Sequence, residues 1–561
     1  MTDAATDYPR TPDLIILAAA LAGAVMGLFN IANTSIGWHL ASGDWILANR
    51  SFLFSDPFSF TSGGAAWIDH EWLFQVGVSV AYSIAGPAAL VGVRAAAVAT
   101  LAVLLLLISV RSGLSPAAAL VLAMVSVAGA HGRFFVRPEL VTLLVVPAAV
   151  WLFLRRDRFS SPGWLAGLAG LMVVGANSHG GALAVPPLFA GILGAEIFQM
   201  TLARKWNRNA IITGIAGLIT AAGALLINPY GWHLFETPVR LAHLVDRASI
   251  PNPEWISPSP TQAPALYAAI VVGVVLLALR ERRVAYWALF ALATVLALRH
   301  IRNTGLFFAL FPLAVAPSLA TWPVLNGARP EHPRVFRRAN LLAVAASALL
   351  AVSLAISPWP GFGFNWADNY YPESACDFLD AQRLPTEQLY NDVRFGGYLI
   401  HRYGPERQVF QDDRNEIHEH LLEEIWNIFQ SSDTTAWTHL LGRYEASTAL
   451  VRYHPQIRVT DPSGNDLGSR GFSTLWFPQK TWALVYWDDV AMVLVRRDSA
   501  PPDLIDRFEY RIFRPDDLSH LEHRLQADPS LIRSVAVELA RAKQVSPTSW
   551  RAQAIDKIIR R

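Results

Sequence analysis

The side chains of this sequence that could do chemistry gather in polar segments between long apolar ones. Carboxylates can accept a proton, guanidinium groups can bind phosphate oxygens, and imidazoles can move a proton or hold a metal ion. Because ionisable groups are costly inside a membrane and usually face a polar cavity, these segments are where we look for function. The candidates are Asp44, Asp56, Asp69 and Glu71, then Arg133, Arg137, Glu254, Arg299 and Arg302, and the histidines His39, His70, His179 and His233.

Each residue type also has a structural role that the sequence leaves open. Asp69 and Glu71 directly precede an apolar segment, where carboxylates cap or stabilise the first turn of a helix. Asp56 precedes Pro57, which is typical of a turn. The arginines could instead extend to the membrane interface or pair with Glu139 or Glu254. The histidines could be ordinary hydrogen-bonding residues, since no two of them have the i, i+4 spacing of a helical metal site.

The elements that must position these residues are apolar helices. Hydrophobic residues make up 53% of the chain and charged residues 16%, and the mean hydropathy is +0.31, which indicates an integral membrane protein. The formal net charge of +2 gives no broad basic surface for a nucleic acid. About eleven windows approach the length of a membrane span: 13–32, 90–110, 115–131, 138–154, 162–177, 182–200, 209–227, 264–280, 283–299, 304–321 and 339–357.

The distribution of basic residues predicts how these spans are oriented. With the N-terminus in the cytoplasm, the inner connections carry more arginine and lysine than the outer ones, as the positive-inside rule requires. The apolar segment 72–85 could also span, but counting it would move the arginine-rich connections to the outer face. We therefore expect it to lie within a first outer loop at 33–89. All the candidate residues then lie on the outer face.

Beyond the last apolar window the sequence changes character. Residues 1–358 are predicted to form the transmembrane domain and residues 359–561 a soluble α/β domain on the periplasmic or extracytoplasmic side. Short strands are expected at 389–393, 397–401 and 408–411, and a hairpin at 482–496. Helical periodicity covers 415–430, 434–443, 516–526 and 530–560. The single cysteine, Cys376, excludes an intramolecular disulfide.

Several short motifs give the chain a family resemblance. The motifs that carry the resemblance are Trp38-His39 with Gly43, Asp56–Thr61, Trp67 with His70–Leu73, Asn391-Asp392 with Gly396–Leu399, and Val409–Arg414. Through them the chain resembles bacterial GT-C-like membrane glycosyltransferases that are themselves uncharacterised, and more distantly protein mannosyltransferases, aminoarabinose transferases and oligosaccharyltransferase catalytic subunits.

The resemblance implies a GT-C-like fold and transfer of a sugar from a polyprenyl-phosphate donor to an acceptor glycan, lipid or protein on the outer face of a bacterial inner membrane. In that class the essential acid lies in the first outer loop, so Glu71 is our preferred catalytic base and Asp69 the second choice. The arginines would neutralise the leaving phosphate, and the remaining candidates would bind substrate. Many relatives use a divalent cation, and the histidines leave that question open here.

One departure from the family pattern keeps a different function in view. Where an aspartate is expected shortly before Trp38-His39, this chain has Asn33-Thr34-Ser35. If that aspartate is the base, the protein is a non-catalytic scaffold or a binder of lipid-linked sugar. A transporter is disfavoured, because the spans are nearly free of charge and show no internal repeat. The motifs of the outer domain could brace the structure or select the acceptor.

Overall fold

The computed structural model describes residues 11–159, 161–236, 240, 254–327, 333–357, 360–460 and 466–560. The chain divides into two compact units. A helical unit comprises Met1–Asn33, Ser42–Leu53 and Ile68–Trp366, and a sheet unit comprises Thr34–Ala41, Phe54–Trp67 and Ala367–Arg561. Two pieces of the predicted first outer loop therefore belong to the same unit as the C-terminal residues.

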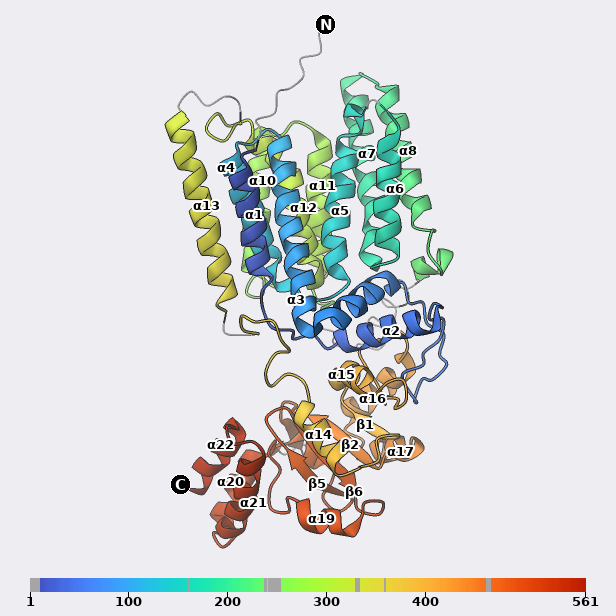
Figure 1. Ribbon diagram of the computed structural model, residues 1–561, viewed down its shortest axis with the longest axis vertical. Helices are drawn as coiled ribbons and strands as arrows, with labels where there is room; N and C mark the ends of the chain where they lie inside the picture. The colour runs from blue at the N-terminus through green and yellow to red at the C-terminus, as the bar shows by residue number, and fades with distance from the viewer. Residues whose placement is uncertain are drawn as a thin grey trace. The chain divides into compact units, whose positions relative to one another are not determined.

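The helical unit is a bundle of apolar helices, most of which run roughly alongside one another in Figure 1. Its long helices are α1 (Asp13–Met26), α3 (Trp72–Arg111), α4 (Pro116–Ala130), α5 (Glu139–Leu154), α6 (Gly163–Ala176), α7 (Val185–Ala203), α8 (Arg208–Ala224), α10 (Pro264–Arg280), α11 (Val284–Arg299), α12 (Thr304–Leu319) and α13 (Pro333–Ala355). Short 3₁₀ turns connect them: η1 (His131–Arg133), η2 (Arg156–Arg158), η3 (Gly180–Ala184), η4 (Gly231–Phe235) and η5 (Ile301–Asn303).

Local sequence explains where several of these helices begin, and packing explains their order. Ser115 precedes Pro116 and its hydroxyl accepts a hydrogen bond from the Ala118 amide, so it caps α4. The Asn207 side chain caps α8 through the Ala210 amide. α12 packs against α4, α10 and α11 and is buried along most of its length. One continuous apolar core therefore joins the bundle.

The helices match the predicted windows, but their number as membrane spans is a separate matter. Each of the eleven windows contains a helix in the structure. Among the described residues, four helices are long and apolar enough to cross a membrane, namely Trp72–Arg111, Pro116–Arg133, Gly180–Ala203 and Arg334–Ala355. Five further apolar helices are shorter. The apolar helices indicate a membrane protein, whereas the eleven-span topology stays a prediction.

Helix α3 changes direction in its first half, and this separates residues 72–85 from the predicted span at 90–110. Ala85 and Gly86 leave the helical conformation, Gly86 with a φ of +57°, and Pro87 follows. Proline cannot donate to the preceding turn, and glycine adopts positive φ without strain. The chain accordingly bends there, and the first part of α3 runs across the bundle direction in Figure 1.

Helix α2 (Ile36–Asn49) was not predicted. Its sequence contains glycine, serine and aspartate among apolar residues, which gives a weak helical pattern. Its first residues, up to Ala41, belong to the sheet unit, and those from Ser42 onward belong to the helical unit.

The sheet unit contains a four-stranded mixed sheet in the order β1-β2-β6-β5. β1 (Leu389–Asn391) is parallel to β2 (Thr448–Arg452), which pairs in antiparallel fashion with β6 (Ala491–Arg496), and β6 pairs with β5 (Trp482–Trp487). The β5–β6 pair confirms the predicted hairpin. β3 (Ile457–Thr460) and β4 (Asp466–Arg470) form a separate antiparallel pair.

Helices complete the sheet unit around an aromatic core that includes Trp437, Trp476 and Trp487. The helices are α14 (Glu373–Ala381), α15 (Val393–Tyr403), α16 (Glu419–Ser431), α17 (Thr434–Arg443), α18 (Phe472–Trp476), α19 (Pro502–Phe508), α20 (Leu518–Ala527), α21 (Leu531–Val545) and α22 (Trp550–Ile559). The predicted α/β character is confirmed for this unit.

Two predicted strands of this unit are wrong. Residues 397–401 lie in α15, because Asp392 caps a helix there by accepting a hydrogen bond from the Arg394 amide at 3.1 Å. Residues 408–411 form no extended strand. Val409 makes a single bridge to Ser59, a residue far away in the sequence.

Candidate functional site

Glu71 stands at the N-terminus of α3 between two histidines (His70 and His179). Its Oε1 lies 3.8 Å from His70 Nε2 and 4.0 Å from His179 Nε2. The side chain is 18% exposed, so it is partly open to solvent. Although Glu71 occupies the N-cap position, its side chain makes no capping hydrogen bond. The helix-capping interpretation therefore does not account for this carboxylate.

The two histidines present opposite hydrogen-bonding functions to Glu71. His70 Nδ1 lies 3.2 Å from the Ile68 carbonyl oxygen, which can only accept, so Nδ1 carries the proton and the neutral ring has an acceptor at Nε2. Burial, with a smaller contribution from the charge of Arg302, lowers the pKa of His70 and favours that neutral ring. In His179, Nδ1 accepts a hydrogen bond from the Gly181 amide at 3.2 Å. The proton of neutral His179 is therefore on Nε2, facing Glu71.

Tight packing of the loop before α7 holds His179 in place. Its Nδ1 also lies 2.7 Å from the Thr142 hydroxyl of α5. A side chain at Gly181 would meet that hydroxyl oxygen at 2.4 Å, and one at Gly180 would meet His70 Nε2 at 3.3 Å. The glycine pair therefore allows both imidazoles to approach Glu71.

Asp69, the second predicted base, is placed differently. It is 2% exposed, and its Oδ1 accepts a hydrogen bond from Gln75 Nε2 at 2.5 Å. Gln75 lies in the first turns of α3, so Asp69 supports the beginning of that helix. The structure thus distinguishes the two carboxylates that the sequence left equivalent: Glu71 is accessible and Asp69 is buried.

A second charged group joins Arg133 and Arg137 to two glutamates. Arg133 contacts Glu139 with Nη2 at 2.6 Å and Glu254 with Nη1 at 3.3 Å. Arg137 Nη1 lies 2.5 Å from Glu254, and its Nε donates to Asn33 Oδ1 at 3.0 Å. Burial acts against the charged form of Glu254, but Arg137, Arg133 and Arg302 overcome it and lower the pKa of this carboxyl to about 2. This is the pairing with Glu139 and Glu254 that the sequence left open.

Arg302 differs from Arg133 and Arg137. Its guanidinium lies over the Trp255 ring at 5.3 Å, and within the described residues it forms no ion pair of its own. Its charge nevertheless acts on both His70 and Glu254. Arg302 is therefore the cation of this region whose hydrogen-bond donors are the most available to a ligand.

The remaining candidates have hydrogen-bond partners, ring contacts or exposed positions of their own. Exposed Asp44 accepts a hydrogen bond from the Ser79 hydroxyl. His39 belongs to the sheet unit, is buried and contacts the Trp38 ring in a tilted arrangement. His233 is 48% exposed and pairs with Glu236. Arg299, at the end of α11, is exposed.

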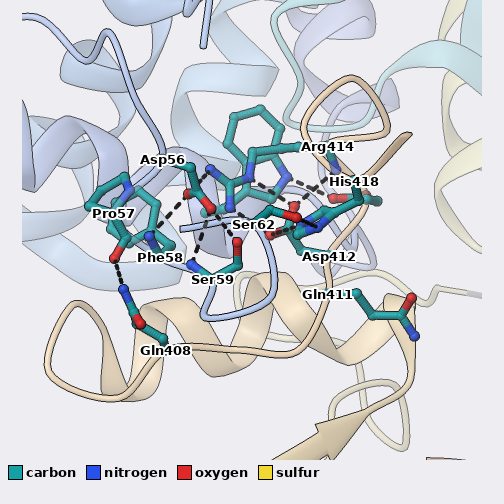
Figure 2. Close-up of polar contacts among 12 residues, drawn as sticks. Asp56, Pro57, Phe58, Ser59, Ser62, Gln408, Gln411, Asp412, Arg414 and His418 are labelled. Carbon is teal, nitrogen blue, oxygen red and sulfur yellow. Dashed lines mark hydrogen bonds and ion pairs between the residues drawn. The ribbon is translucent and has the colours of Figure 1, made fainter. Parts of the chain in front are cut away.

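The sheet unit contains a charged cluster of a different kind, the Arg414 cluster, formed by Arg414, Asp56, Asp412, His418 and Ser62 (Figure 2). Arg414 Nη2 lies 2.6 Å from Asp412 and Nη1 lies 2.9 Å from Asp56, and all three side chains are 0% exposed. His418 bridges Asp412 at 3.1 Å and Ser62 at 3.0 Å. Arg414 and His418 overcome the effect of burial and hold the pKa of Asp412 well below its usual range.

Asp56 has the turn role that its sequence predicted, and an ion pair in addition. Its carboxylate accepts hydrogen bonds from the amides of Phe58 at 3.0 Å and Ser59 at 3.2 Å. The guanidinium of Arg414 then uses the remaining capacity of that carboxylate. This link could not be read from the sequence, because the two residues are 358 positions apart.

Asp413 accepts hydrogen bonds from the segment in which the family pattern has an aspartate. Its Oδ2 accepts hydrogen bonds from the hydroxyls of Thr34 and Ser35, and its Oδ1 accepts one from Trp38 Nε1, each at 2.7 Å. A carboxylate is therefore present at the start of α2, supplied by a distant segment of the sheet unit.

The glycines of the outer-domain motif lie where two backbone segments approach closely. A side chain at Gly397 of α15 would lie 2.1 Å from the Thr34 carbonyl oxygen, and one at Gly37 would lie 2.0 Å from the Gly397 carbonyl oxygen. Only glycine fits at both positions. Residues 34–41 of the first loop and the glycine motif of the outer domain thus pack together as one structural brace within the sheet unit.

The described residues do not fit a metal ion held by the protein. Among them, no three side chains of histidine, cysteine, aspartate or glutamate are grouped so that they could hold one.

Comparison with known proteins supports the fold. No family model and no curated protein matches the chain. The structure is similar to the crystal structure of the Archaeoglobus fulgidus oligosaccharyltransferase in the apo form, with a TM-score of 0.55 and 13% sequence identity. The similarity covers 84% of this chain and 79% of that chain. At this identity the similarity shows a shared fold.

Proposed function

We propose that the protein is an integral-membrane glycosyltransferase that moves a sugar from a polyprenyl-phosphate donor to an acceptor on the outer face of a bacterial inner membrane. The observation that carries the proposal is the group formed by Glu71, His70 and His179, with Arg302 acting on it electrostatically. The GT-C-like fold supports the same reaction class. Membrane lipid and a glycan, lipid or protein acceptor are the partners that this function needs.

The reaction assigns a role to each side chain of the group. An acceptor hydroxyl that enters between His70 and Glu71 donates its proton to Glu71, and the acceptor oxygen forms a bond with the anomeric carbon. The bond between that carbon and the phosphate oxygen breaks, and the phosphate leaves with the electron pair. His70 Nε2 and Glu71 Oε1 are both acceptors 3.8 Å apart, so a hydroxyl donor between them satisfies a contact that they cannot make with each other.

Arg302 is the group that stabilises the leaving phosphate in this proposal. A guanidinium can bind two phosphate oxygens at once and stays charged at the membrane surface. Arg133 and Arg137 already contact Glu139 and Glu254. They are positioning residues, and Glu254, held ionised, keeps Arg302 in place through its charge.

The test is sugar release from a panel of polyprenyl-phosphate sugars by the purified full-length protein in lipid. Glu71→Gln should lower turnover by a factor of about 10²–10⁴, the usual contribution of a general base, while the protein stays folded. Glu236→Gln is the matched control, because that glutamate pairs with His233 and is not part of the Glu71 group. Full activity of the Glu71→Gln variant would contradict the assignment of the base.

A non-catalytic function has one observation in its favour. Asn33, beside the position of the expected aspartate, has an amide side chain that cannot act as a base, and it is hydrogen-bonded to Arg137 and to the Val136 carbonyl oxygen. Donor binding by the wild-type protein with no turnover on the whole panel would favour a lipid-linked-sugar binder over a transferase.

A further inference from the structure

The sheet unit contains a second group of arginines, separate from the Arg414 cluster, around a cavity of about 90 Å³. Side chains from the end of β4, from α18 and from the start of α20 line it, together with the segment before α20. The polar lining includes Arg470, Thr474, Arg514, Asp517, His520 and Arg524. One water molecule needs only about 10–15 Å³ of such space, so a group as large as phosphate can enter.

Arg514 is the residue that makes this cavity unusual. It is 8% exposed, and its Nη2 donates to the carbonyl oxygens of Phe477 at 3.3 Å and Trp482 at 3.2 Å. Its Nη1 is buried and has no hydrogen-bond partner among the described residues. A buried guanidinium without a carboxylate partner is expensive, and burial accordingly lowers the pKa of Arg514 to about 10.

The other polar groups of the cavity also retain hydrogen-bonding capacity. Arg470 Nε donates to Asp517 Oδ2 at 2.8 Å, and Arg524 Nη1 donates to the Ile512 carbonyl oxygen at 2.6 Å. Asp517 Oδ1 and Thr474 Oγ1 are buried without a partner within the described part of the chain. Three guanidinium groups and one carboxylate therefore give the cavity lining an excess of positive charge.

We propose that this cavity binds a phosphate-class oxyanion that carries a hydroxyl group, either hydrogen phosphate or the phosphate of a monoester. Arg514 Nη1 donates to an anionic oxygen, with Arg470 and Arg524 beside it. Asp517 Oδ1 accepts a hydrogen bond from the hydroxyl of the same group. Because a carboxylate can only accept, the site discriminates against sulfate, which has no proton to donate at neutral pH. The inference does not depend on the proposed transferase activity.

Calorimetry of the full-length protein in lipid nanodiscs tests this site, with inorganic phosphate, sulfate and glycerol phosphate as probes. Phosphate should bind with saturation and more tightly than sulfate. Arg514→Gln and the half-buried Arg524→Gln should each weaken phosphate binding about tenfold or more, as expected for a lost charge-assisted hydrogen bond. Arg443→Gln is the control, because Arg443 pairs with Glu424 on the surface of the same unit.

Asp517→Asn separates this site from general attraction of anions. An amide can donate as well as accept, so this variant should bind sulfate more tightly and lose the preference for phosphate. His520, whose pKa is lowered by burial and by the charge of Arg470, should titrate at a higher pH once phosphate is bound. Absence of saturable phosphate binding, or equal binding by the wild-type and Arg524→Gln proteins, would overturn the proposal.

The source of the phosphate is settled by comparing two forms of the ligand. Competition by glycerol phosphate in solution would indicate a soluble phosphate ester. A rise in the pKa of His520 seen only in nanodiscs that contain phosphatidic acid would indicate a lipid headgroup. Either result supports the oxyanion site, and failure of both together with saturable binding of inorganic phosphate would make hydrogen phosphate the ligand.

Discussion

The Glu71 group and the Arg414 cluster contain similar residue types and differ in the length of their contacts and in their exposure to solvent. In the Glu71 group the two histidine contacts are 3.8 and 4.0 Å long and the side chains are 13–18% exposed. In the Arg414 cluster the two guanidinium–carboxylate contacts are 2.6 and 2.9 Å long and the side chains are 0% exposed. One group is partly exposed to solvent, and the other is closed to it.

This difference shows which charged motifs of the sequence are structural. Asp56 and Arg414 both belong to motifs that carry the family resemblance. Their side chains nevertheless pair with each other, and Arg414 also pairs with Asp412. Glu71 is held at a helix N-terminus without a capping bond. Charge alone did not distinguish the two cases, whereas burial and pairing do.

The largest effect on stability is expected from Arg414→Met, which would leave Asp56 and Asp412 buried without their cation. We expect a loss of about 3–5 kcal/mol in the free energy of unfolding, the usual cost of breaking a buried ion pair. Thermal unfolding followed by tryptophan fluorescence measures it. Arg443→Met, which breaks an exposed pair with Glu424, should cost about 0–1 kcal/mol. Equal losses in the two variants would remove the distinction between the clusters.

A smaller loss is expected where backbones approach closely in the sheet unit. Gly397→Ala places a methyl group 2.1 Å from the Thr34 carbonyl oxygen, and such overpacking costs about 1–3 kcal/mol. Gly442→Ala is the control, because its position in α17 is open and exposed. That variant should gain about 0.5–1 kcal/mol from helix propensity. If Gly397→Ala is as stable as wild type in chemical denaturation, the brace is not tightly packed.

A change in pH dependence would sharpen the assignment of the Glu71 group. The reaction needs neutral His70, so activity should be full above the pKa of His70 and should fall as the pH drops through it, below 6.5. Arg302→Gln removes a charge that lowers this pKa, so the acid limb should move to higher pH, in addition to an overall lower rate. Arg299→Gln, at an exposed position, should leave the limb unchanged. An unmoved limb in Arg302→Gln would show that Arg302 does not act on His70.

The smallest effect on stability is expected from Glu71→Gln, in contrast to Arg414→Met. Glu71→Gln keeps the size of a partly exposed side chain that lies 3.8 and 4.0 Å from the two histidines. We expect its free energy of unfolding to change by no more than about 0.5 kcal/mol. Differential scanning fluorimetry measures this. A loss comparable to that of Arg414→Met would make Glu71 a structural residue.

Local sequence patterns predicted most helices and the hairpin. Elements that depend on contacts between distant segments were missed or predicted wrongly. The apolar windows found the bundle helices, and the two short apolar segments on either side of Asp488-Asp489 found the β5–β6 hairpin. The segment 397–401 was wrong because the cap supplied by Asp392 outweighed its strand-like composition. Helix α2 was missed because its pattern is weak and its glycine, Gly37, serves a contact with α15.

The candidate site was predictable only in part for the same reason. His70 and Glu71 are neighbours in the sequence, so their proximity needed no fold. The contact with His179 depends on Thr142 and on the glycine pair of η3, which no local pattern relates to Glu71. Arg302 could not be separated from Arg133 and Arg137 until their pairing with glutamates was known.

The pairing of Asp56 with Arg414 has a consequence for biogenesis. The two residues are 358 positions apart, and ribosomes add about 5–20 residues per second. Asp56 is therefore synthesised roughly 20–70 s before its partner exists. During that time the nascent protein must keep an unpaired acidic segment soluble and accessible. A C-terminal fragment made alone would carry Arg414 without Asp56, so its maturation should require the N-terminal loop to be supplied, either in the same chain or in trans.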